Sequence, residues 1–154
     1  MTHLRAGFIL IFACFLITVS LDGCRKVKTK IGLGELVEYP NEGTPEKVIQ
    51  EVLKSAAMPE EEGWQKFTTL LHSEEKLPTL LNNWRQFSYR EIRKKADYFI
   101  KDKAMFSFKI KDEKSEGESL KIYIENSMSD VPTPCTLRKD KSEGDAWKVF
   151  GSCL

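Results

Sequence analysis

The chain has 154 residues, of which 41% are hydrophobic and 31% are charged, and its formal net charge at pH 7 is only +1. This composition is typical of a folded globular domain and excludes an intrinsically disordered chain. A general nucleic-acid-binding protein would carry a strong basic excess, which this sequence lacks, so we expect no nucleic-acid partner.

The first 23 residues have the organisation of an export signal. Arg5 gives the segment a basic start, and the apolar stretch 6–20 follows it. This stretch is shorter than the roughly 20 apolar residues that a membrane-spanning helix requires. We therefore predict a signal peptide over residues 1–23 that is removed on export.

The residues after the apolar stretch resemble the lipobox of bacterial lipoproteins, which ends in the cysteine that receives the lipid. Leu21, Gly23 and Cys24 match that pattern, whereas Asp22 stands where a small neutral residue is usual. The resemblance implies that Cys24 carries a palmitate-type anchor in a membrane and that the domain lies in the cell envelope, outside the cytoplasm. Arg25 stands where such lipoproteins commonly carry the Asp that marks inner-membrane retention, which favours the outer membrane if the source has two membranes.

Two other arrangements of the N-terminus remain open. Cleavage after Ser20 would leave Cys24 as a single exposed thiol, and an uncleaved segment would itself anchor the chain. The cysteine count favours lipidation, because Cys14 leaves with the signal and Cys24 takes the lipid. Cys135 and Cys153 then remain as a pair that an exported protein can oxidise to a disulfide.

Residues 24–43 are expected to form a basic, flexible tether. The segment begins with Arg25 and three lysines and continues with glycines and Pro40. Basic side chains close to a membrane attract anionic head groups by about 1 kcal/mol each, but a merely solvated linker has the same composition. The remaining length suits one domain over residues 44–154.

Helical patterns fill the first half of this domain. Thr44 and Pro45 provide an N-cap and a first helical residue, and apolar residues then recur at helical spacing as far as Pro59. Three more helices are predicted over residues 60–72, 77–87 and 88–99. The last of them has an outer side rich in basic residues, which we interpret as a solvated face rather than a binding patch (Arg90, Arg93, Lys94, Lys95).

The hydrophobic period then changes from about 3.6 to 2. Apolar and polar residues alternate over 105–110 and 120–125, which predicts two antiparallel strands joined by a charged turn at 111–119. Residues 126–134 are expected to form a loop. The inward positions of the two strands are all apolar, which indicates a filled core (Phe106, Phe108, Ile110, Leu120, Ile122, Ile124).

The last twenty residues predict a β-hairpin around the turn 141–145. If Lys141 lies opposite Trp147 in an antiparallel register, Cys135 lies opposite Cys153, close enough for a disulfide. Closing the loop between the two cysteines would stabilise the fold by roughly 3 kcal/mol. Neither cysteine has a CxxC partner, so we expect no zinc site, and no motif indicates a cofactor.

The order of elements predicts an α+β fold with N-terminal helices packed on a curved antiparallel sheet of about four strands. From about Thr44 to Leu154 the chain resembles the nuclear-transport-factor-2-like, or cystatin-like, fold, and more narrowly the small domains of unknown function that bacterial lipoproteins carry. The resemblance lies in the opening helix, in a second helix that ends in Leu70-Leu71, and in the residues 144–149 of the closing strand. It implies a cone-like fold that encloses a pocket.

Enzymes of that superfamily place acid and base groups in the pocket. Tyr89, Asp97, Tyr98 and Tyr123 are the polar residues that could line such a pocket here, although each is more simply a surface or half-buried structural residue. No catalytic constellation is present. We therefore expect a lipid-anchored envelope protein with a non-catalytic domain that binds another envelope protein or a small ligand. The alternative is a small-ligand-binding or isomerase-like enzyme that uses the cone pocket.

Overall fold

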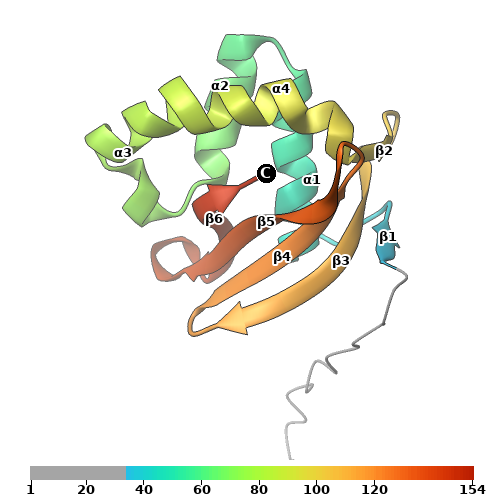
Figure 1. Cartoon of the computed structure of the whole chain (residues 1–154). Helices are drawn as coiled ribbons and strands as arrows, with labels where there is room; N and C mark the ends of the chain where they lie inside the picture. The colour runs from blue at the N-terminus through green and yellow to red at the C-terminus, as the bar shows by residue number, and fades with distance from the viewer. Residues whose placement is uncertain (1–33) are drawn as a thin grey trace, which may run out of the picture.

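The computed structural model describes residues 34–154. The predicted signal peptide (1–23), Cys24 and the first part of the expected tether therefore lie outside the described residues. In the described part, helices cover one face of an antiparallel sheet, as Figure 1 shows. The predicted α+β class is confirmed, and the sheet is open rather than closed into a barrel.

The first two helices follow the predicted starts. Helix α1 spans Pro45–Ala57, and the Thr44 hydroxyl accepts a hydrogen bond from the Lys47 backbone N–H at 3.3 Å. Helix α2 spans Glu60–Leu70, and the 3-10 helix η1 follows at Ser73–Lys76. The apolar stripe of α1 packs into the core because Ile49, Val52 and Leu53 recur on one side of the helix.

The helices predicted over 77–87 and 88–99 form one continuous rod. Helix α3 (Pro78–Asn83) passes through a single π-helical turn, η2 (Trp84–Ser88), into helix α4 (Tyr89–Phe99), and the junction residues keep right-handed helical angles. An additional residue in a turn rotates the side chains that follow it. Trp84 and Tyr89 are buried, whereas Phe87, which we expected on the apolar side, is 65% exposed.

The sheet has six strands in the described residues, not about four. They are β1 (Glu35–Val37), β2 (Ile100–Asp102), β3 (Ser107–Glu116), β4 (Ser119–Asn126), β5 (Ser129–Asp140) and β6 (Ala146–Cys153). The order across the sheet is β1-β3-β4-β5-β6, and β2 pairs with the start of β3. Strands β1 and β2 were missed because three residues are too few to show an alternating pattern. Strand β1 also lies within the range that we expected to be tether and precedes all the helices.

Two segments predicted as a turn and a loop belong to strands. The expected charged turn at 111–119 is reduced to Gly117 and Glu118, and the expected loop at 126–134 is reduced to Ser127 and Met128. Charged residues extend β3 past the core because ladder hydrogen bonds use the backbone and the side chains remain in water. On the β6 side, the prolines of β5 lie beyond the last paired residues, Cys135 and Cys153, so β6 does not require their missing N–H.

The last hairpin pairs the two cysteines through a register that differs from the predicted one. Lys139, not Lys141, lies opposite Trp147, and Leu137 lies opposite Val149. A bulge then inserts two additional residues in β6 before Cys135 meets Cys153. Gly151 lies in this bulge with φ of +80°, a left-handed conformation that favours glycine.

One hydrophobic core joins the helices to the inner face of the sheet. The predicted inward residues Phe108, Ile110 and Ile122 are buried, as are Leu120 and Ile124. Phe106 is the exception, because it lies in the turn before β3 with φ of +52° and is only half-buried. The inner face is therefore a packed layer below the helices, and functional groups must be sought elsewhere.

Candidate functional site: the outer face of the sheet

The four residues proposed to line a pocket do not come together. Tyr89 is 2% exposed, and its hydroxyl donates a hydrogen bond to the Ser55 carbonyl oxygen at 2.8 Å, so it is part of the core. Asp97 is exposed and pairs with Lys103 at 2.9 Å. Tyr98 and Tyr123 lie on a helix and on a strand, respectively. These residues serve separate local contacts.

Neither Asp97 nor Tyr98 lines either of two surface depressions in the described part. One, of about 240 Å³, lies beside α4 (Glu60, Arg90, Arg93, Lys94). The other, of about 470 Å³, lies between α2 and α3 (Trp64, Thr68, Thr69, Lys76, Leu81). The residues that sequence reasoning selected for a cone pocket therefore do not line these two depressions.

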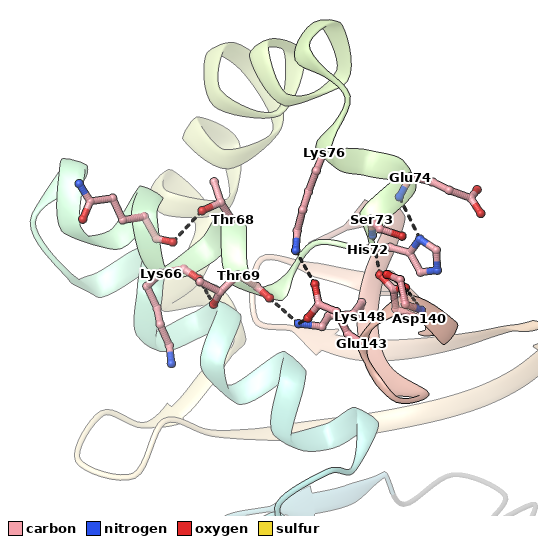
Figure 2. A network of polar contacts seen from close by, with 12 residues as sticks. Lys66, Thr68, Thr69, His72, Ser73, Glu74, Lys76, Asp140, Glu143 and Lys148 are labelled. Carbon is pink, nitrogen blue, oxygen red and sulfur yellow. Dashed lines mark hydrogen bonds and ion pairs between the residues drawn. The ribbon is translucent and has the colours of Figure 1, made fainter.

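A buried carboxylate joins η1 to the turn between β5 and β6 at one end of the sheet. Asp140 is 1% exposed; one carboxylate oxygen accepts the Ser73 N–H at 2.7 Å and the other accepts the Ser142 N–H at 2.9 Å and the Ser142 hydroxyl at 2.6 Å. These hydrogen bonds hold the pKa of Asp140 well below its usual range, against the effect of burial. Figure 2 shows Asp140 beside Ser73 and His72. The carboxylate is a structural link between η1 and the β5–β6 turn.

The same junction contains His72 and a second carboxylate. His72 is buried and caps η1, with its Nδ1 accepting the Glu74 N–H at 3.2 Å. Glu143 contacts Lys76 at 2.8 Å and Lys148 at 2.6 Å, as Figure 2 shows. These two ammonium groups lower the pKa of Glu143. The polar residues of this junction are satisfied by one another, which indicates a structural role.

The face of the sheet opposite the helices, called the outer face below, is polar and basic. Because side chains alternate along a strand, the neighbours of the buried residues of β3 and β4 point away from the core. In the register, Leu36 lies opposite Lys109, Tyr123 opposite Asp112, and Lys121 opposite Lys114. No other described element lies over the β3 and β4 part of this face in Figure 1.

One carboxylate on the outer face is shared by three lysines. Glu125 lies 2.7 Å from the Lys101 ammonium, 2.6 Å from Lys111 and 3.5 Å from Lys109. These contacts lower the pKa of Glu125 to about 2, hydrogen bonding to Lys101 being the largest cause, although partial desolvation opposes the shift. Glu125 therefore stays ionised in neutral solution. The four groups carry a net charge of +2.

Sequence reasoning missed this cluster, although the sequence contained a signal for it. Lys109 and Glu125 are outward positions in the predicted alternation, and a lysine at 111 follows directly. Assigning residues 111–119 to a turn removed Lys111 and Lys114 from the sheet. The contribution of Lys101 depends on β2, which no sequence pattern predicted.

Cys135 and Cys153 are the predicted site residues that the structure does bring together. Their sulfur atoms lie 1.93 Å apart, within disulfide bonding distance, and both residues are buried. Among residues 34–154, no helix is long and apolar enough to cross a membrane, and no group of three or more His, Cys, Asp or Glu side chains is arranged to hold a metal ion. No protein-family model, curated protein or solved structure matches this chain.

Proposed function

We propose that this protein is a lipid-anchored component of a bacterial cell envelope whose α+β domain binds or assembles without catalysis. Cys24 carries the lipid, and the domain stays outside the cytoplasm. The observation that carries the proposal is the Cys135–Cys153 pair. Structural disulfides persist in oxidising compartments and are rare in the cytosol, so a paired, buried disulfide favours an exported domain.

The position of the chain entry agrees with an anchored domain. Gly34 runs beside β3, where a Cβ atom would lie only 2.4 Å from the Ile110 carbonyl oxygen. The chain after β1 is held as well, because the Gln50 side-chain amide donates hydrogen bonds to the carbonyl oxygens of Glu38 at 3.1 Å and Met105 at 2.9 Å. The segment that starts at Cys24 therefore joins the folded domain at a fixed edge of the sheet.

The test is metabolic labelling of the full chain with a fatty-acid analogue in a bacterial host that processes lipoproteins. We expect label in the wild-type protein, full loss of label in Cys24→Ala and unchanged label in Cys14→Ala. The second variant is a matched control, because it removes the other N-terminal cysteine. Alkylation without reductant should leave Cys135 and Cys153 unmodified. An unlabelled wild-type protein, or label that persists in Cys24→Ala, contradicts the proposal.

A further inference from the structure

We infer that the outer face of the sheet docks on anionic phospholipid head groups of the membrane that holds the anchor. This inference rests on the proposed function, because the lipid on Cys24 brings the domain to that membrane. It adds a defined orientation, with the sheet facing the lipid and the helices facing away. The face is a membrane-contact surface rather than a solvated side of the domain.

The first argument for docking on anionic lipid is the net positive charge of the outer face. Five lysines and three carboxylates lie on it in the described part of β1–β4, an excess of two positive charges (Lys101, Lys109, Lys111, Lys114, Lys121; Asp112, Glu116, Glu125). Lysine side chains are long, and no element within residues 34–154 covers β3 and β4 on this side, so the ammonium groups can reach head groups outside the domain.

The second argument is the place where the segment after Cys24 joins the sheet. Strand β1 belongs to this sheet, and its Leu36 is 51% exposed on the outer face, opposite Lys109. Only ten peptide units separate Cys24 from Gly34. That length reaches at most about 36 Å when fully extended. A lipid on Cys24 therefore limits how far the lysines of β3 can move away from the membrane surface.

The short connection also decides whether a weak contact is sufficient. Each lysine close to an anionic surface changes the binding equilibrium constant about fivefold, which would be too little to hold a freely diffusing domain. A tethered domain meets the surface at a high effective concentration, so a small net attraction is enough to orient it. Leu36 adds an apolar side chain at the same place. The anchor supplies the affinity, and the outer face supplies the orientation.

The experiment is a lysine footprint of the mature, lipidated protein reconstituted into vesicles. One preparation contains phosphatidylcholine alone. The other contains phosphatidylcholine with roughly 30% phosphatidylglycerol as the anionic lipid. Acetylation of each lysine is then measured by mass spectrometry. We expect Lys109, Lys111 and Lys114 to react several-fold more slowly on the anionic vesicles. Lys94 and Lys95 on α4 should react equally on both. The difference should disappear at 1 M salt, where screening reduces the Debye length to about 3 Å.

Charge variants separate docking from a general loss of structure. Lys109→Gln combined with Lys111→Gln should reduce the ratio of docked to undocked molecules on anionic vesicles about 25-fold, at roughly fivefold per charge. Glu125→Gln should increase it about fivefold, because one negative charge leaves the face. Unfolding cannot produce changes in opposite directions. The matched control, Lys94→Gln combined with Lys95→Gln, removes the same charge from α4 and should leave the docked population unchanged.

Two results overturn the inference. Equal acetylation of the outer-face lysines on neutral and anionic vesicles shows that the face does not contact lipid. Protection in intact cells but not on vesicles assigns the face to a protein partner instead. Both results leave the proposed function intact if fatty-acid label is still found on Cys24. Absence of that label overturns the proposed function independently of the footprint.

Discussion

Replacing Asp140 with alanine tests whether one buried carboxylate holds the junction between η1 and the β5–β6 turn. The substitution removes the acceptor of two backbone N–H groups, those of Ser73 and Ser142, and of the Ser142 hydroxyl. Loss of a helix-capping acceptor costs about 1 kcal/mol, and hydrogen bonds to a charged group are stronger than neutral ones. The two N–H groups are partly accessible to water, which limits the penalty. We therefore expect a loss of about 2–3 kcal/mol in the free energy of unfolding, or about 10 °C in melting temperature.

Thermal and urea unfolding of the mature protein in detergent, followed by circular dichroism, measures this loss. Asp130→Ala is the matched control, because Asp130 lies on the same strand and is exposed. Its effect should stay within about 0.5 kcal/mol. If Asp140→Ala melts together with Asp130→Ala, the carboxylate does not hold the junction and the reasoning is refuted.

The pH dependence gives a second, independent readout. Because the pKa of Asp140 is lowered in the folded state, the unfolded chain binds the proton more tightly, and stability increases with pH. The contribution is complete above the unfolded pKa of about 3.9 and is lost as the pH falls through the folded pKa. Asp140→Asn cannot titrate. The stability difference between wild type and Asp140→Asn should therefore shrink progressively below about pH 4. A difference that is constant with pH contradicts the assignment.

Three further predictions concern other parts of the domain. Cys135→Ser combined with Cys153→Ser should lower the free energy of unfolding by roughly 3 kcal/mol, and reductant should lower the wild-type stability but not that of the variant. In the wild type, the stabilising contribution of Glu125 is lost as the pH falls from about 4.3, the unfolded pKa, through the folded pKa of about 2. Glu125→Gln cannot titrate, so its free energy of unfolding should decrease less over this pH range. A decrease with the wild-type slope would contradict this. Gly63→Ala should lower the free energy of unfolding by about 1–3 kcal/mol, because the new Cβ would lie 2.2 Å from the Ser55 carbonyl oxygen and 2.4 Å from the Tyr89 hydroxyl. In the same urea assay, Gln65→Ala should have little effect, because Gln65 is exposed.

Local patterns were sufficient where neighbouring residues determine the structure. The cap at Thr44 and the proline after it predicted the start of α1, because a side-chain acceptor and a fixed φ act within one turn. The alternation around Ile110 and Ile122 predicted two strands and their buried side. The pairing of Cys135 with Cys153 was also predicted, but through a register that the bulge at Gly151 replaces.

The sequence by itself determined the helices and the apolar sides of the central parts of β3 and β4, since these properties follow from spacing along the chain. Only the tertiary structure decided which polar groups meet. Asp140 and Ser73 are 67 residues apart, and the group around Glu125 needs Lys101 from β2 as well as the bulge that redirects Lys111. Such contacts depend on strand register, on bulges and on short edge strands, which are set by the packing of the whole domain rather than by neighbouring residues.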